Sequence, residues 1–284
     1  AEADYIEQPI GEVEFQEEAP SPDQPEEPEE APSEEPKEEP TAPEHEEVLK
    51  ENTVQVQSTD TYTEGDYTYT VANGVATITK YTGSATTLNI PETLGGYEVQ
   101  GIGYEAFDSY KSLQEIIIPD SITKIDRYAF DNCSNLSKVV LSKNLETLSR
   151  GAFRNCDALT SIAIPRSLRN TDSTYYEGPF SGCDNLTNVT FETGIAVIPE
   201  DLFKGSGLER ITLPDTLTEI GYQAFDSCKK LQEIVIPDSV TKVGGYAFDN
   251  CSNLSKVVLS KNLETLSRGA FRDCDALTSI AIPK

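Results

Sequence analysis

Residues 220–242 read IGYQAFDSCKKLQEIVIPDSVTK, and units with this pattern recur along residues 101–284. The phenylalanine of the unit returns eight times, at intervals of 23, 23, 27, 23, 22, 23 and 23 residues. It stands at Phe107, Phe130, Phe153, Phe180, Phe203, Phe225, Phe248 and Phe271. A unit of about 23 residues is too short to bury a core alone, so successive units are expected to stack. The repeat therefore predicts a solenoid.

Within each unit, one segment has the alternation of a half-buried strand. In residues 231–236 this alternation points Leu231, Ile234 and Ile236 into the solenoid and leaves the residues between them outside. Stacking merges the inward positions into one apolar column. We expect about eight units, mainly β, joined by short helical or 3-10 turns.

The chain divides into three parts. Residues 1–52 form an acidic segment rich in proline and glutamate, which we expect to be a disordered tether because like charges and proline do not support a core. Residues 53–100 hold an N-terminal cap and a partial first repeat. The cap is predicted as a β-hairpin around Asn73-Gly74, because both residues tolerate a positive φ. The repeats occupy residues 101–284.

An internal duplication overlies the repeat. Residues 128–154 are identical to residues 246–272, and the wider blocks 101–165 and 219–283 differ at only ten positions. The two blocks are offset by 118 residues. Both are therefore expected to offer nearly the same outer surface.

The pattern A-F-x-x-C-x-x-L-x-x-I-x-I-P, followed by an apolar residue and I-G, resembles the BspA-like leucine-rich repeats of bacteria over about residues 86–284. The resemblance implies a leucine-rich-repeat solenoid. It also implies a secreted or cell-surface protein used in adhesion and protein recognition. Function must still be argued from the site, because a fold does not fix a function.

Charge and the start of the chain bear on location. Residues 1–50 carry 19 acidic and two basic residues, and residues 51–284 carry 30 and 20. The acidic balance argues against nucleic acid as a partner. No apolar run is long enough to span a bilayer. The chain contains no methionine, not even at residue 1, so we expect an exported protein whose signal peptide was removed or whose end was trimmed.

The six cysteines follow the repeat phenylalanine by three residues in six of the eight units. This position is inward, which favours buried, reduced thiols that act as small apolar groups. Disulfides and a metal site remain open alternatives, although no C-x-x-C pair is present.

The sequence offers no catalytic machinery or cofactor motif. The one histidine, His45, lies in the predicted tether, which removes histidine-dependent catalysis and histidine-ligated zinc from the repeats. Glu115 and Glu233 lie about five coils apart, too far to act as a pair in glycoside hydrolysis. No glycine-rich phosphate loop occurs. We therefore expect no enzyme, no metal and no cofactor.

Two surfaces are candidates for protein binding. One is the outer side of the main strands, because an extended sheet face can hold a partner across several coils. Its residues are Gln114, Glu115, Ile117, Lys138, Thr160, Thr187, Asn188, Thr190, Glu209, Arg210, Thr212, Gln232, Glu233 and Lys256. The other is the four-residue expansion before Phe180, which contains Tyr175 and Tyr176. These tyrosines suit a binding site, or they fold back over the neighbouring coil.

Three functions follow as hypotheses. The first is an extracellular protein-binding or adhesion module whose partner is an extracellular protein, which could include a host protein. The second is a carbohydrate-binding module that uses the two tyrosines. The third is a structural spacer. Because Lys284 directly follows a predicted strand, either the natural chain continues or this exposed edge pairs with another chain, giving a monomer or weak dimer.

Overall fold

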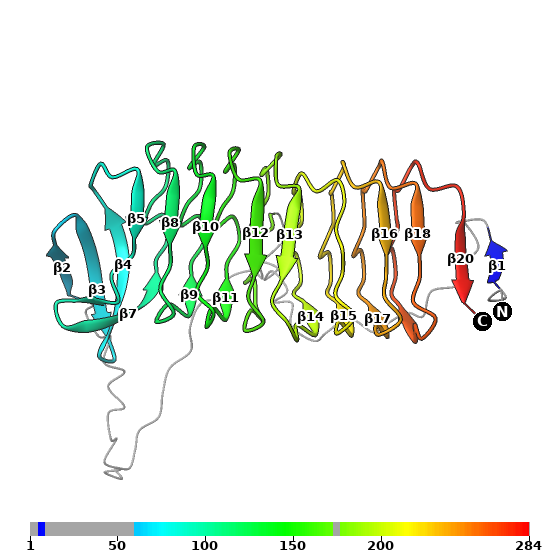
Figure 1. Cartoon of the computed structure of the whole chain (residues 1–284), viewed down its shortest axis with the longest axis horizontal. Coiled ribbons are helices and arrows are strands. Elements are labelled where there is room, and N and C mark those ends of the chain that lie inside the picture. Colours follow the sequence, from blue (N-terminus) through cyan, green and yellow to red (C-terminus); the bar gives the residue numbers. More distant parts are fainter. Residues whose placement is uncertain (1–4, 9–59, 173–176, 284) are drawn as a thin grey trace, which may run out of the picture. The chain divides into compact units, whose positions relative to one another are not determined.

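The computed structural model describes residues 5–8, 60–172 and 177–283, and the repeats form a β-solenoid (Figure 1). Nine coils follow one another from β5 to β20, with residues 208–213 in place of a strand in the sixth. In most coils, a strand of three or four residues contributes to one face and a two-residue strand to a second face. The predicted leucine-rich-repeat solenoid is confirmed.

The first face, which we call the ladder face, contains the longer strands. They are β5 (Thr87–Asn89), β8 (Glu115–Ile117), β10 (Lys138–Val140), β12 (Ser161–Ile164), β13 (Asn188–Phe191), β16 (Glu233–Val235), β18 (Lys256–Val258) and β20 (Ile280–Pro283). Hydrogen bonding groups them as β5-β8-β10, β12-β13 and β16-β18-β20, all parallel. The register places Lys138 beside Glu115 and Lys256 beside Glu233.

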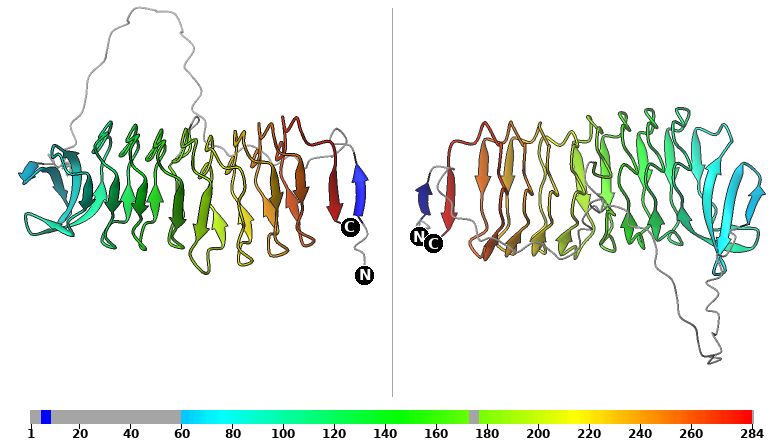
Figure 2. Two further views of the ribbon diagram at one scale, coloured as in Figure 1. Left: turned by 45° about the horizontal axis from the view of Figure 1, so that its top comes forward. Right: turned by 180° about the vertical axis from the view of Figure 1, so that it is seen from behind.

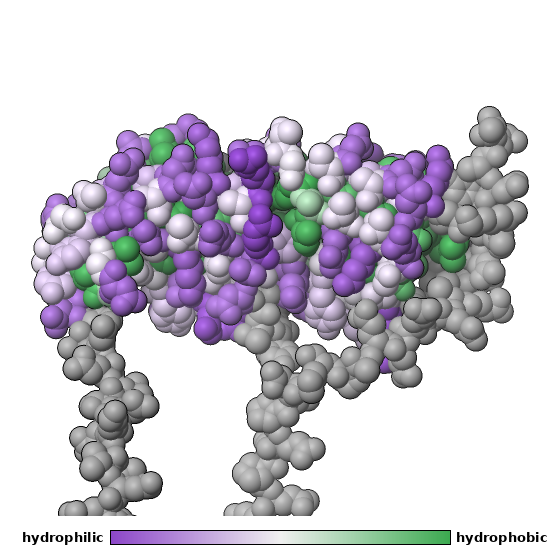
Figure 3. Space-filling model, turned by 90° about the horizontal axis from the view of Figure 1, so that it is seen from below, coloured by the Kyte–Doolittle hydropathy of each residue, from purple (hydrophilic) through white to green (hydrophobic). Residues whose placement is uncertain are grey.

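The second face contains the shorter strands. They are β9 (Lys124–Ile125), β11 (Thr147–Leu148), β14 (Val197–Ile198), β15 (Glu219–Ile220), β17 (Lys242–Val243) and β19 (Thr265–Leu266), together with the end of β7 (Tyr97–Ile102). Seen from below, the solenoid is mainly hydrophilic, with smaller apolar areas between the hydrophilic side chains (Figure 3).

The predicted hairpin is present at the start of the solenoid. It consists of β3 (Tyr67–Ala72) and β4 (Val75–Tyr81), joined by Asn73 (φ 53°) and Gly74 (φ 80°). β2 (Thr61–Glu64) extends it on the outer side, and β6 (Thr93–Leu94) pairs with β7. β4 pairs in parallel with β7, which attaches the hairpin to the second face. The hairpin thus covers the first coil.

The phenylalanines stack in one column along the interior. Centroids of neighbouring rings lie 4.9–6.1 Å apart, and the ring planes are close to parallel. Tyr81 of the hairpin begins the column, since its ring stacks on Phe107 at 5.4 Å. The inward strand residues Leu231, Ile234 and Ile236 are buried beside this column, as the alternation predicted.

The segment around each phenylalanine forms turns. The described residues contain no helix of any type, so the predicted helical or 3-10 turns are wrong. The reason is visible in the coil of Phe225, where Gln223 (φ 51°) and Ser227 (φ 59°) both adopt the left-handed conformation. A left-handed residue on each side of the phenylalanine prevents a right-handed helix from forming.

The six thiols are buried, as predicted from their inward position, and the cysteines are free. Each thiol donates a hydrogen bond to the carbonyl oxygen of the phenylalanine one coil earlier, over 2.9–3.3 Å. Burial raises the pKa of the Cys133 and Cys228 thiols to about 12. In the first full coil Tyr110 takes the cysteine position, and its hydroxyl donates to the Ala85 carbonyl under the hairpin.

The ladder face is interrupted in the sixth coil. The interval from Phe203 to Phe225 is one residue shorter than the usual 23, and the cysteine position is lost. Gly207 lets the backbone lie close against the coil before it, because a Cβ there would lie 2.3 Å from the carbonyl oxygen of Asp184. The described residues 208–213 consequently form no strand.

One strand lies in the segment predicted to be a disordered tether. β1 (Tyr5–Gln8) pairs antiparallel with β20, with Glu7 opposite Ala281, and Figures 1 and 2 show the two strands side by side. For these four residues the structure departs from the prediction. An unpaired strand edge is a template for another strand, and tyrosine and isoleucine favour strands. The rest of the predicted tether lies outside the described residues.

Candidate binding surfaces

Outside the sixth coil, the outward residues of the ladder face lie where the alternation placed them. Their side chains are exposed, apart from the half-buried Glu115 and Glu233. Four aliphatic side chains stand out from this face: Ile117 is 38%, Val140 42%, Val235 50% and Val258 37% exposed. The duplication makes them two pairs, one on β8 and β10 and one on β16 and β18. We call these pairs the first and second aliphatic patches.

A charged pair adjoins each aliphatic patch. Lys138 donates to Glu115 beside the first patch, and Lys256 donates to Glu233 beside the second. The Lys256 hydrogen bond lowers the pKa of Glu233, and the charges of Lys256 and Arg210 act in the same direction. The lysines are exposed and the glutamates are half-buried, so the two pairs contribute little to folding and remain available to a partner.

The interrupted coil changes part of the predicted surface. Glu209, Arg210 and Thr212 were predicted on the strand ladder, but the structure assigns them to no strand. Arg210 still reaches toward the second patch, with its Nη1 3.9 Å from Glu233 Oε2. Four residues, Gln114, Thr160, Thr187 and Gln232, stand just before strands, and their side chains are exposed.

Tyr175 and Tyr176 lie outside the described residues. The residues that flank them contact neighbouring coils: Thr171 Oγ1 donates to the Glu200 carbonyl over 2.7 Å, and Asp172 lies 3.8 Å from Arg127 Nε. Glu177, directly after the two tyrosines, belongs to a cluster that sequence reasoning missed.

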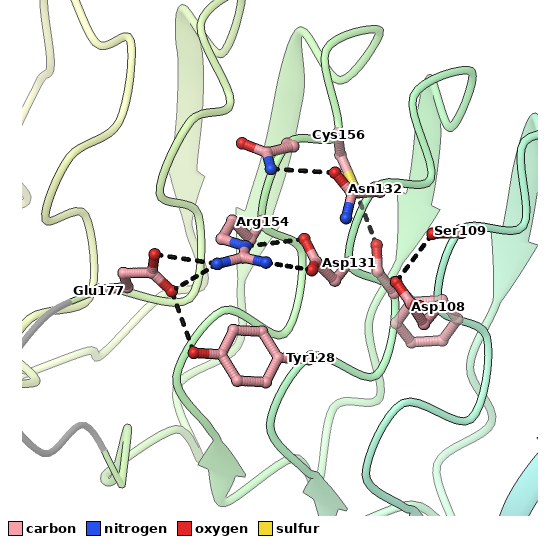
Figure 4. Close-up of polar contacts among 10 residues, drawn as sticks. Asp108, Ser109, Tyr128, Asp131, Asn132, Arg154, Cys156 and Glu177 are labelled. Atoms are coloured by element: carbon pink, nitrogen blue, oxygen red, sulfur yellow. Dashed lines mark hydrogen bonds and ion pairs between the residues drawn. The ribbon is translucent and has the colours of Figure 1, made fainter.

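This cluster joins three coils through Arg154 (Figure 4). The guanidinium donates to Asp131 on one side, with Nε 2.9 Å from Oδ1. On the other side Nη1 donates to both oxygens of Glu177, at 3.0 and 3.1 Å. The Tyr128 hydroxyl also donates to Glu177, over 3.2 Å. Glu177 is thus a carboxylate held by one arginine and one tyrosine.

The ring of Tyr128 supports this arrangement. The Arg154 guanidinium lies 4.7 Å and that of Arg150 5.2 Å from the ring centroid. Hydrogen bonds to Asp131 are the largest cause of the raised pKa of Arg154, so the group stays charged. Tyr128 adopts a left-handed φ of 57°, which is uncommon for a bulky residue. Such strain persists only where the surroundings fix it.

The duplication builds the same arrangement at residues 246–272. Tyr246 also has a φ of 57°, the Arg272 guanidinium lies 4.8 Å from its ring centroid, and Arg272 Nε donates to Asp249 Oδ1 over 2.9 Å. The signal for these clusters was present in the sequence as the identical 27-residue stretch. The clusters were not predicted, because tyrosine has no preference for the left-handed conformation that positions its ring here.

Metal-ligating side chains do not gather into a cluster in the described residues. No group of three or more histidine, cysteine, aspartate or glutamate residues among them could hold a metal ion. A search of the same residues finds no helix long and apolar enough to cross a membrane. The buried Lys204 is paired, with Nζ 2.7 Å from Gln223 Oε1 and 3.1 Å from Asp226 Oδ2.

Several solved structures resemble this chain. A leucine rich cell surface protein from Faecalibacterium prausnitzii is 25% identical, covering 78% of this chain and 82% of its own, with a TM-score of 0.38. A leucine-rich repeat protein from Bacteroides capillosus is 34% identical, covering 46% and 98%, with a TM-score of 0.41. The leucine-rich repeat protein of T. pallidum is 25% identical, covering 75% and 77%, with a TM-score of 0.42. The comparison with curated proteins finds no match.

The family comparison covers most of the chain. The family described as "BspA type Leucine rich repeat region (6 copies)" matches residues 75–179 and 173–284. These ranges include the second strand of the hairpin and every coil of the solenoid. The chain therefore belongs to the family of BspA-type leucine-rich-repeat proteins.

Proposed function

We propose that this chain is a protein-binding module of a bacterial cell surface, without catalytic activity, and that the ladder face is its binding surface. The observation that carries the proposal is the exposure of Ile117, Val140, Val235 and Val258 on one face. An apolar centre bordered by charged groups is the usual anatomy of a protein interface.

The preference of strands for valine and isoleucine explains these exposed side chains less well than a binding surface does. Strands favour valine and isoleucine even without a partner, so a single exposed valine means little. Here both patches pair their aliphatic side chains with a Glu–Lys pair on neighbouring strands. At about 4.8 Å per coil, five coils separate equivalent residues of the two patches by roughly 24 Å. This spacing lets one partner contact both patches.

The cell-surface part of the proposal has separate support. The chain belongs to a family of repeat proteins, and the similar protein from F. prausnitzii is named a cell surface protein.

A binding panel tests the proposal. The full chain is screened against extracellular proteins and against glycans, beside the double variant Val235→Glu/Val258→Glu. The control is Val197→Glu, which places one glutamate on a valine of the second face that is 37% exposed. We expect a protein partner that the double variant loses and the control keeps.

The other outcomes decide between the remaining functions. A hit on glycans alone would support the carbohydrate-binding alternative. If no binding were detected on either panel, the structural-spacer alternative would be favoured. A protein hit that Val197→Glu abolishes and the double variant keeps would move the binding surface to the second face.

A further inference from the structure

The two aliphatic patches differ in the coil that precedes them. Before the first patch, β5 pairs with β8, and Ile90 donates its backbone N–H to the Ile117 carbonyl oxygen over 3.0 Å. Before the second patch lies the sixth coil, in which residues 208–213 form no strand between β13 and β16 (Figure 1). The second patch therefore borders the interruption of the ladder face, and the first patch does not.

The interruption leaves the backbone of Val235 without a strand partner on one side. In the first patch, the carbonyl oxygen of Val140 accepts from Ile118 of the preceding coil over 2.9 Å. The corresponding donor for Val235 is Leu213, but in the part of the chain that the structure describes residues 209–213 donate no backbone hydrogen bond. The Val235 N–H likewise donates to no carbonyl oxygen of the sixth coil. Both groups can therefore pair with an added strand.

A groove of about 600 Å³ lies beside these backbone groups. Its apolar lining includes Ile211 and Leu213 of the sixth coil and Val235 and Val258 of the second patch. Ile211 stands at the same inward position as Ile234 of the next coil, but it is half-buried whereas Ile234 is fully buried. The sixth coil thus exposes a side chain that other coils bury. The groove suits an aliphatic side chain of a ligand.

The rim of the groove carries an aspartate that other coils would pair. Where an aspartate follows the proline after a main strand, a lysine usually lies on the next coil. Asp120 Oδ2 lies 3.9 Å from Lys143 Nζ, and Asp238 Oδ2 lies 3.7 Å from Lys261 Nζ. For Asp215 the equivalent position on the next coil is Asp238, and among the described residues no lysine or arginine pairs with the exposed Asp215 carboxylate. A basic side chain of a ligand would supply the missing cation.

These three features specify one kind of occupant. The open N–H and C=O of Val235 fit an extended backbone, the apolar lining fits an aliphatic side chain, and Asp215 fits a lysine or arginine. A glycan fits less well, because its hydroxyl groups would lose water against an aliphatic lining. The groove therefore favours a peptide segment over a sugar.

We propose that this groove binds an extended segment of the protein partner, in which one aliphatic side chain fills the groove and one basic side chain pairs with Asp215. The proposal rests on the function proposed above and names the part of the partner that is recognised. Backbone hydrogen bonds to Val235 supply affinity, and the two side chains supply specificity. The second patch is then the anchor of the ladder face, and the first patch contacts the partner without adding a strand.

Peptide selection on the full chain tests the groove. A displayed library of random linear peptides is the probe, and Kd is measured for the enriched peptides. Thr212→Trp fills the groove from an exposed position that lines it. The matched control is Thr190→Trp, at the equivalent exposed position one coil earlier, on the paired strand β13. We expect Thr212→Trp to raise Kd at least about tenfold and the control to leave it unchanged, with melting temperatures confirming that both variants are folded.

The role of Asp215 is tested with the same peptides. Enriched sequences should share a lysine or arginine near an aliphatic residue, and Asp215→Asn should raise their Kd about threefold, the effect of one exposed ion pair. Asp120→Asn is the matched control, because it removes the equivalent carboxylate beside the first patch. Changing the basic residue of the peptide to Gln should abolish the effect of Asp215→Asn, because the two changes remove the same interaction.

Backbone methylation tests strand pairing. The backbone nitrogens of an enriched peptide are methylated one at a time, and methylation of the N–H that donates to Val235 should raise Kd at least about fivefold. A library that enriches no peptide, an unchanged Kd with Thr212→Trp or Asp215→Asn, or equal Kd for all methylated peptides would each overturn the proposal.

The protein partner separates this proposal from the function on which it rests. If the partner loses affinity for the double variants of the aliphatic patches but binds Thr212→Trp normally, the ladder face stands as the binding surface and the groove is overturned. Unchanged affinity in all of these variants would overturn both. Loss of affinity with Thr212→Trp but not with Thr190→Trp is the result expected of the groove.

Discussion

The thiol of Cys228 donates a hydrogen bond to the carbonyl oxygen of Phe203, one coil earlier, over 3.1 Å. The same bond recurs at every cysteine of the repeat. The repeated spacing of three residues from phenylalanine to cysteine therefore helps to hold neighbouring coils together. It places a buried thiol donor against a carbonyl oxygen of the preceding coil.

This burial predicts thiols that do not react in the native protein. The pKa of Cys133 and Cys228 is raised to about 12, so the thiolate that attacks a disulfide reagent is nearly absent at neutral pH. With a chromogenic disulfide reagent we expect no fast-reacting thiol in the folded chain and six after unfolding in urea. A stoichiometric fast reaction in the folded chain would contradict the buried assignment.

The same raised pKa values predict a loss of stability at alkaline pH. In the unfolded chain the thiols ionise near their ordinary pKa of about 8.5, whereas in the folded chain they stay protonated. The folded state then binds more protons, so the free energy of unfolding is intact below about pH 8.5 and falls as the pH rises toward 12. Melting temperatures across this range should decline, and less steeply in Cys228→Ala. A melting temperature that stays constant from pH 8.5 to 12 would contradict the raised pKa of these thiols.

Gly151→Ala is expected to destabilise the fold. The new Cβ would meet the Tyr128 ring at 2.5 Å, and Gly151 has a φ of +60°. The combined clash and strain should lower the free energy of unfolding by about 1–3 kcal/mol in urea titrations. Gly74→Ala is the control for strain alone, because φ is +80° but no atom lies within 4 Å. If Tyr128→Ala did not relieve part of the Gly151→Ala loss, the ring contact would not be its cause.

Lys204→Met should destabilise the chain far more than Lys256→Met. Lys204 is buried against Asp226, and its removal leaves that carboxylate without its cation at a cost of about 3–5 kcal/mol. Lys256 is exposed, so loss of its pair with Glu233 should change the free energy of unfolding only slightly. Urea titration of the two variants compares them directly, and equal losses would show that Lys204 is not part of a buried ion pair.

Much of the fold was predictable because it depends on periodicity. The inward positions of Leu231, Ile234 and Ile236 and the turn at Asn73-Gly74 follow from alternation and from residue preferences. The turns around Phe225 did not follow, because Gln223 and Ser227 have no strong preference for the left-handed conformation they adopt. Stacking of coils imposes it.

The candidate sites were predictable in part. Most of the ladder face could be placed residue by residue, because its strands pair in one repeated register outside the sixth coil. Its interruption could not, because a one-residue deletion near Gly207 acts through the backbone of the neighbouring coil. The hydrogen bonds between Arg154 and Glu177 were not predicted either, because the two residues lie 23 positions apart on different coils.

The affinity of the ladder face for its partner tests the central claim most directly. With the protein partner found in the panel, Kd is measured for the two double variants Ile117→Glu/Val140→Glu and Val235→Glu/Val258→Glu and for the control Val197→Glu. Loss of buried apolar contacts should weaken binding at least about tenfold in each double variant and leave the control unchanged. Unchanged affinity in both double variants would contradict the account.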